Sequence, residues 1–152
     1  MKKLLKTILP ITVLFAFCGI MQGKCQNNNE KEIIGTWQMD QKAVLKEMKA
    51  ADKEKIEKMN MGRKTALESS LASRVFTFSA DGFFGARWMA RGNHHQVVGK
   101  WRISDKTLST EINGERKEYI IESLTINRLV LLPMGKQRGM LNKLIFIKTP
   151  EK

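Results

Sequence analysis

From residue 74 to residue 148, short apolar stretches alternate with polar turns at intervals of roughly ten residues. The apolar stretches are rich in Val, Ile, Phe, Trp and Thr, whose side chains suit a half-buried pleated surface. Between them stand Gly, Asn, Asp and Ser, the residues that tight turns favour. This pattern predicts seven strands joined by hairpins, over residues 74–79, 83–91, 96–103, 107–112, 115–122, 128–132 and 142–148.

A further strand is predicted over residues 33–39, which carry Gly35 and Trp37. Consecutive hairpins form an antiparallel meander, and a long meander tends to close on itself because closure removes the exposed edges. A closed sheet of eight strands has an interior that holds packed side chains or one small ligand. We therefore expect a mainly β fold, an eight-stranded antiparallel up-and-down barrel with a helical insertion between strands 1 and 2.

The expected insertion covers residues 41–72, where Lys, Glu, Ala and Met replace the strand-forming residues. Asp40 can cap a first helix over residues 41–59 by accepting backbone N–H bonds. One broad face of this helix is apolar at 3.6-residue spacing, although Asp52 and Lys55 interrupt it. The face consists of Leu45, Met48, Ala51, Ile56 and Met59.

A helix end is predicted at Asn60-Met61-Gly62, since glycine readily adopts the left-handed conformation that ends helices. A shorter helix is predicted over residues 63–72, with Leu67 and Leu71 facing inward. The insertion is therefore expected to be a pair of helices or one kinked helix.

The first segment, residues 1–25, has the features of a bacterial secretory signal. Three lysines precede a mostly apolar stretch over residues 8–21, which is too short and too interrupted to span a membrane. Ordinary cleavage after Cys25 is the favoured outcome, and lipid anchoring at Cys18 or Cys25 is the alternative, because neither cysteine follows a small residue. We expect an exported protein of the periplasm or cell envelope.

After the signal, the chain is expected to consist of one domain. Residues 26–32 are polar and predict a flexible leader. The barrel domain would cover residues 33–148, and residues 149–152 would form a short tail. A length of 152 residues suits a single hydrophobic core.

The formal net charge is +12, from 27 basic and 15 acidic residues. Such a charge favours contact with anionic envelope surfaces. The basic residues are spread along the chain and do not cluster, so no role in nucleic-acid binding is expected. The sequence sets no oligomeric state.

No catalytic or cofactor-binding motif stands in the chain, and we expect a protein without enzymatic activity, cofactor or metal. His94 and His95 follow Gly92-Asn93 and are expected at a polar hairpin turn. Adjacent residues of an extended segment point to opposite faces, so the pair is a poor metal chelator. Four acidic residues on the late strands are explained by cross-strand charge pairs on a solvated face: Glu111, Glu115, Glu118 and Glu122.

The chain resembles the small bacterial lipocalin-like proteins of the envelope. The resemblance is carried by Gly35-Thr36-Trp37 in the first strand and by the segments at residues 76–82, 98–103 and 119–124. It implies a lipocalin-like barrel that holds small apolar molecules. It also implies that Trp37, two residues after Gly35, plugs the closed end of the barrel and that Lys148 packs over its ring, with cation–π character.

A candidate ligand pocket is predicted from aromatic residues that share strand faces beneath the helical insertion, where methionines are adaptable partners. The alternative is that these residues fill a dry core. Arg87, Met89 and Arg91 form a second face of their strand, and an inward orientation of that face would favour an anionic ligand. The candidate ligand-binding residues are Met48, Met59, Phe76, Phe78, Phe84, Trp88 and Trp101.

The leading interpretation is an exported lipocalin-like protein that binds or carries a small apolar or amphipathic ligand. The alternative is an interaction module with a filled barrel and a basic surface. Cavity volume distinguishes them, since ligand pockets measure several hundred Å³.

Overall fold

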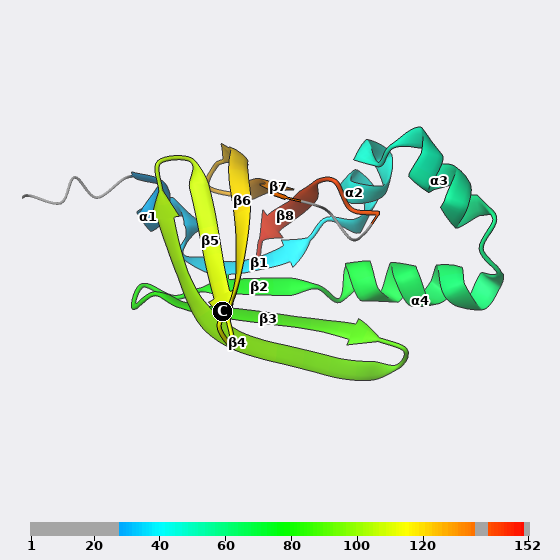
Figure 1. Ribbon diagram of the computed structural model, residues 1–152, viewed down its shortest axis with the longest axis horizontal. Coiled ribbons are helices and arrows are strands. Elements are labelled where there is room, and N and C mark those ends of the chain that lie inside the picture. The colour runs from blue at the N-terminus through cyan, green and yellow to red at the C-terminus, as the bar shows by residue number, and fades with distance from the viewer. Residues whose placement is uncertain (1–27, 136–139, 151–152) are drawn as a thin grey trace, which may run out of the picture.

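In the computed structural model, which describes residues 28–135 and 140–150, eight antiparallel strands close into a barrel. Each strand pairs with the next along the chain, and the first pairs with the last (Figure 1). The predicted up-and-down barrel is therefore confirmed. The strands are β1 (Gly35–Met39), β2 (Val75–Phe78), β3 (Phe83–Ala90), β4 (Asn93–Ser104), β5 (Thr107–Ile112), β6 (Glu115–Leu124), β7 (Arg128–Pro133) and β8 (Leu144–Lys148).

Local turn chemistry explains the short hairpins of the meander. At the β5–β6 turn, Asn113 and Gly114 both have positive φ, 51° and 80°, as a tight two-residue turn requires. The barrel closes where β1 pairs with β8, with Trp37 opposite Lys148 and Met39 opposite Phe146. In β6 the register with β7 shifts between Ile121 and Ser123, a bulge of the kind that helps a sheet to curve.

Helices lie on two sides of the barrel. Figure 1 shows α1 at one side and α2, α3 and α4 together at the opposite side. Here α4 packs against β3 and β1, and α2 packs against β8. These helices are α1 (Asn28–Ile33), α2 (Gln41–Glu47), α3 (Ala50–Glu57) and α4 (Met61–Ala72). The insertion between the first two strands is thus confirmed, with a different division into helices.

The expected flexible leader over residues 26–32 is wrong for its described part. Residues 28–33 form α1, and Ile33, which the sequence places in the first strand, belongs to this helix. Ile33 is fully buried, and its carbonyl oxygen accepts a hydrogen bond of 2.7 Å from Trp37 Nε1. The segment is ordered because it contributes an apolar side chain to the core.

The single helix expected over residues 41–59 is also wrong. Met48 and Lys49 have extended backbone conformations, with ψ of 145° and 146°, and separate α2 from α3. The Asp40 cap is present, with its Oδ1 atom accepting a bond of 3.0 Å from the Ala43 N–H. Both residues at the break suit a helix, so the break reflects tertiary packing of the buried Met48 side chain.

Gly62 does not end a helix, contrary to the prediction. It is the second residue of α4, because Asn60 caps that helix by accepting a 2.9 Å hydrogen bond from the Arg63 N–H. Asn60 is a favourable cap, and its side chain satisfies an N–H group that would otherwise lack a partner.

The polar turn expected at His94 and His95 is wrong as well. Both residues belong to β4, where His94 lies opposite Met89 and His95 opposite Trp88. The turn is instead at Arg91 and Gly92, which have positive φ values of 52° and 79°. As expected of an extended segment, the two imidazoles lie on opposite faces.

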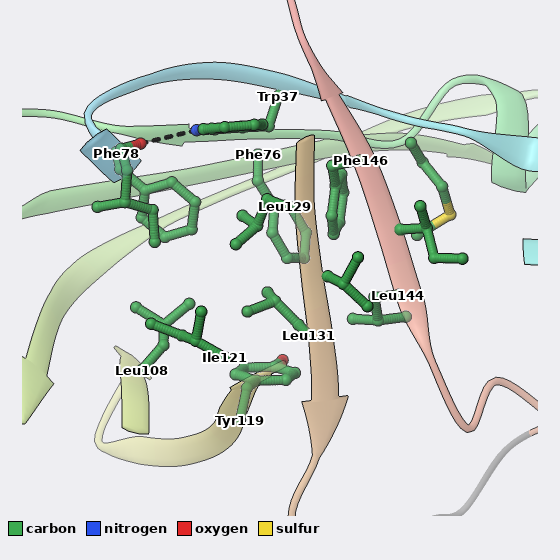
Figure 2. Close-up of a cluster of buried hydrophobic side chains, with 14 of the residues drawn as sticks. Trp37, Phe76, Phe78, Leu108, Tyr119, Ile121, Leu129, Leu131, Leu144 and Phe146 are labelled. Atoms are coloured by element: carbon green, nitrogen blue, oxygen red, sulfur yellow. Dashed lines mark hydrogen bonds between the residues drawn. The ribbon is translucent and has the colours of Figure 1, made fainter. Parts of the chain in front are cut away.

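The apolar core lies inside the barrel. Trp37 is fully buried at one end of the core, and Tyr119 lies at the other (Figure 2). Between them lie Phe76, Phe146 and Leu131. We call the end next to α1 the closed end, and the opposite end, where the β3–β4 and β5–β6 hairpins turn, the open end.

The expected signal segment, residues 1–25, with Cys18 and Cys25, lies outside the described residues, and so does part of the expected tail. Within the described residues, none of the helices has the length and apolar character needed to cross a membrane.

Candidate functional site

A pocket of about 490 Å³ opens at the open end of the barrel. This volume falls in the usual range for pockets that hold small molecules. Six of the eight strands contribute to it, which is a consequence of closure, because inward side chains of neighbouring strands converge. The lining residues are Arg74, Phe76, Phe84, Ala86, Trp88, Val97, Thr110, Ile112, Asn113, Glu115, Lys117, Tyr119 and Leu144.

One wall of the pocket is apolar and continuous. Phe76 and Phe84 pack edge to face with ring centroids 5.1 Å apart, and both are buried. Trp88 extends this wall toward the rim, where its ring stacks on His95 at 5.4 Å and an interplanar angle of 12°. Leu144 faces them from β8. The wall offers a ligand a surface for burial of apolar groups.

Arg74, Thr110 and Tyr119 supply polar side chains to the pocket lining. Burial lowers the pKa of Arg74 from its usual value, and the neighbouring Tyr119 opposes that shift. Burial raises the pKa of Tyr119, while a hydrogen bond with Thr110 and the charge on Arg74 lower it. Arginine remains charged despite such a shift. The pocket therefore holds a charged guanidinium and a neutral phenol.

The rim at the β5–β6 hairpin is polar and exposed. Asn113, Glu115 and Lys117 stand there, and all three side chains are open to solvent. Glu115 and Lys117 carry opposite charges, so Arg74 provides the net charge of the lining.

Three of the predicted ligand-binding residues line the pocket: Phe76, Phe84 and Trp88. Phe78 and Trp101 lie instead toward the closed end, with their ring centroids 5.6 Å apart in an edge-to-face contact. Trp101 Nε1 donates a hydrogen bond of 3.0 Å to the Ser79 carbonyl oxygen. Phe78 is buried in the core and the partly buried Trp101 packs against it, so neither lines the pocket and their assignment to it is corrected.

The two methionines predicted to contact a ligand do not line the pocket. Met48 is buried between α2 and α3, and Met59 is half-buried beyond the end of α3. The helices of the insertion contact β1, β3 and β8, and neither methionine belongs to the pocket lining. The expectation that methionines of the insertion cover a ligand is therefore corrected.

The basic face of β3 points away from the pocket. Ala86 and Trp88 line the pocket, so Arg87 and Met89, at alternate positions, lie on the outside, and Arg87 is exposed. The orientation that the sequence left open is thus settled. The cations of the pocket lining are instead Arg74, which immediately precedes β2, and Lys117 of β6.

Sequence reasoning missed Arg74 and Tyr119. A signal was present for each, because Arg74 precedes Phe76 by two positions and shares its strand face. Tyr119, likewise, alternates with exposed residues of β6 and shares a face with the buried Ile121.

At the closed end, Lys148 Nζ lies 5.2 Å from the centroid of the Trp37 ring. It also donates a hydrogen bond of 3.1 Å to the Glu32 carbonyl oxygen in α1. Gly35 stands beside this pair with a φ of 129°. This φ favours glycine because other residues rarely adopt it, and a Cβ atom on Gly35 would also come within 2.7 Å of Lys148 Cε and displace that side chain.

Two of the acidic residues on the late strands take part in charge pairs. Glu118 accepts from Arg116 of the same strand at 2.6 Å, and Glu122 pairs at 2.8 Å with Lys143, which precedes β8. Neither is a pair between neighbouring strands, so the expected cross-strand arrangement is wrong for these two residues. Among the described residues, no group of three His, Cys, Asp or Glu side chains has an arrangement that could hold a metal ion.

A search of curated proteins gives no match. One similar solved structure is a lipocalin-like protein from Bacteroides uniformis ATCC 8492, with 16% identity and a TM-score of 0.48, covering 78% of this chain and 99% of that chain. Another is an uncharacterized protein from Bacteroides eggerthii DSM 20697, with 15% identity and a TM-score of 0.47, covering 77% and 99%. The family model of the lipocalin-like domain matches residues 33–131, more than half of the sequence, and the chain therefore belongs to the lipocalin-like domain family.

Proposed function

We propose that this chain binds a small apolar or amphipathic molecule in the pocket at the open end of the barrel and carries out no chemistry on it. The observation that carries this proposal is the pocket itself, about 490 Å³ with a continuous apolar wall. A filled barrel would leave no such space. The lipocalin-like fold, typically a binding and carrier fold, supports the same conclusion.

Burial of the ligand's apolar surface would drive binding. Each Å² removed from water contributes about 25 cal/mol before the costs of association are subtracted. Phe76, Phe84 and Trp88 present aromatic surface for this purpose, and the half-exposed Trp88 marks the route to solvent. Binding would therefore change the surroundings of Trp88 and its fluorescence.

We propose also that the protein works in the periplasm or cell envelope, after removal of residues 1–25. The support is the sequence of that segment, with its basic start and apolar stretch. The intact mass of protein isolated from a bacterial host tests the proposal. A mass that begins at Gln26 agrees with it, a lipid mass on Cys18 or Cys25 indicates an anchored form, and an uncut chain contradicts export.

Native mass spectrometry of the isolated protein, followed by organic extraction, tests the binding proposal. We expect a retained small molecule, or uptake of one when the protein is mixed with lipids. Ala86→Phe fills the pocket and should abolish that species. Arg87→Phe places the same side chain on the outer face of the same strand and should leave it unchanged.

A persistent ligand-free mass across lipid classes would contradict the binding proposal. It would favour the alternative of an interaction module that acts through its basic exterior. Crosslinking in the envelope would then identify the partner.

A further inference from the structure

The backbone of Arg74 is held firmly between the helical insertion and the barrel. Its N–H donates to the Leu71 carbonyl oxygen at 3.2 Å, and its own carbonyl accepts from the Met39 N–H at 2.9 Å and from Gln38 Nε2 at 3.2 Å. It immediately precedes β2 and shares the inward face of Phe76. These hydrogen bonds fix the backbone of Arg74 on both sides, and its side chain lines the pocket.

Within the described part of the chain, no carboxylate pairs with the Arg74 guanidinium. The ion pairs join other residues, and the acidic residue of the pocket lining, Glu115, is exposed at the rim. Removing a cation from water without a counter-charge costs free energy. The Arg74 side chain is partly buried, so part of this cost is already met when the protein folds, and an anion that enters the pocket gains the attraction of the cation.

Tyr119 is the second residue of the pocket lining that can hydrogen-bond to a ligand. Its side chain is buried on β6, it also lines the pocket, and Arg74 is close enough to lower its pKa. Because burial raises that pKa above the usual value of 10.0, the hydroxyl keeps its proton in neutral solution and can donate a hydrogen bond. A guanidinium and a phenol that share one pocket make a suitable cradle for oxygen acceptors.

We propose that the pocket selects an amphipathic molecule with a carboxylate head group, bound by Arg74 and Tyr119, and with an apolar tail along Phe76, Phe84 and Trp88. This inference rests on the proposed binding function and specifies the class of ligand. A ligand with one negative charge matches the lining. The charges of Glu115 and Lys117 offset each other, so the net charge of the lining is the single positive charge of Arg74. A planar carboxylate also matches the two parallel donors of a guanidinium.

Binding of three dodecyl compounds to protein isolated from cells expressing the full chain tests the inference. Dodecanoate, dodecanol and dodecylammonium have the same tail and differ in the charge of the head group. We expect dodecanoate to bind about tenfold or more tightly than dodecanol, and dodecylammonium to bind more weakly than either. Tryptophan fluorescence and calorimetry give the affinities.

Arg74→Gln should remove the advantage of dodecanoate and leave the affinity for dodecanol unchanged. Arg74→Lys keeps the charge without the planar fork and should keep part of the advantage. Tyr119→Phe should weaken dodecanoate binding several-fold, by the loss of one hydrogen bond. Arg87→Gln, on the outer face, is the matched control and should change nothing.

The outcomes separate this inference from the proposed function. Dodecanol bound as tightly as dodecanoate would overturn the carboxylate assignment and leave the binding function standing. No binding of any of the three compounds would overturn both. Dodecyl phosphate bound more tightly than dodecanoate would also overturn the assignment, in favour of a more highly charged head group.

Spectroscopic titration of Tyr119 tests the inference without any substitution. It is the chain's single tyrosine, so the phenolate absorbance reports on it alone. A carboxylate bound beside it should raise its pKa, because two negative charges repel. A pKa that is the same with dodecanoate and with dodecanol would place the head group elsewhere and overturn the inference.

Discussion

The ammonium group of Lys148 lies 5.2 Å from the centroid of the Trp37 ring, a contact that joins β8 to β1 where the barrel closes. The same ammonium donates a hydrogen bond to the Glu32 carbonyl oxygen, and Trp37 Nε1 donates to the Ile33 carbonyl oxygen. Both contacts hold α1 against the closed end. These contacts stabilise the closed end, whereas the pocket lies at the open end.

Replacing Lys148 with Met should lower the free energy of unfolding by about 1–2 kcal/mol. The variant loses one cation–π contact and one hydrogen bond to a carbonyl group. Urea unfolding followed by Trp fluorescence measures the loss. Lys42→Met at an exposed position of α2 is the control, and an equal effect at both sites would contradict a specific role for Lys148.

Much of the fold could be predicted because its signals are local. Alternating apolar positions and turn residues such as Asn113-Gly114 specify strands and hairpins without reference to the rest of the chain. The break at Met48 could not be predicted, since a buried side chain set it against good helix propensity. Whether a helix ends or begins near Gly62 depended on the cap made by Asn60.

The candidate site was predictable in part. Phe76 and Phe78 share one strand face, and periodicity alone cannot tell that the first lies in the pocket and the second in the packed core. That difference depends on the position of α1, which closes one end of the barrel. Arg74 was overlooked because it stands at the junction of a helix and a strand, where an arginine is ordinarily solvated.

Gly99 should tolerate no side chain. A Cβ atom there would lie 2.0 Å from the Glu111 carbonyl oxygen and 2.9 Å from Ile112 Cγ1, so the pairing of β4 with β5 would have to move. Gly99→Ala should therefore destabilise the protein by about 3 kcal/mol or more. Thermal or urea unfolding checks this, and a loss below about 1 kcal/mol would contradict the close approach.

Gly62→Ala should have the opposite effect. Gly62 lies inside α4, where the nearest contact of an added Cβ atom is an ordinary 3.7 Å from Asn60 Oδ1. Alanine should raise the free energy of unfolding by about 0.5–1 kcal/mol, because it restricts the unfolded chain and favours the helix. Destabilisation would indicate the left-handed helix end that the sequence alone predicts.

The pKa of Tyr119 should lie above 10.0 in the native protein and return toward that value in the unfolded chain. The contribution of the neutral phenol to stability is then complete below pH about 10 and is lost as the pH rises through the native pKa. The charged groups of the pocket lining are Arg74, Glu115 and Lys117. Arg74→Gln removes a positive neighbour and should raise the native pKa further.

Absorbance titration in the absence and presence of urea measures both values, because the chain has one tyrosine. Circular dichroism at each pH identifies the range in which the protein stays folded. A native pKa at or below that of the unfolded chain would contradict the burial of Tyr119.

Lys143 should tie the helical insertion to the barrel. Its ammonium lies 2.8 Å from a Glu122 carboxylate oxygen on β6 and 3.7 Å from a Glu47 carboxylate oxygen in α2. The hydrogen bond with Glu122 is the main cause of a raised pKa of Lys143, so this link is complete between neutral pH and about 10.5 and is lost as the pH rises through the native pKa. Both carboxylates are well exposed, which limits the loss of unfolding free energy in Lys143→Gln to about 1 kcal/mol or less.

This loss should shrink at high salt, where exposed charges are screened, and protease should cleave the α2–α4 segment of the variant faster than that of the original protein. Equal losses at low and high salt, with unchanged proteolysis, would show that Lys143 does not hold the insertion in place.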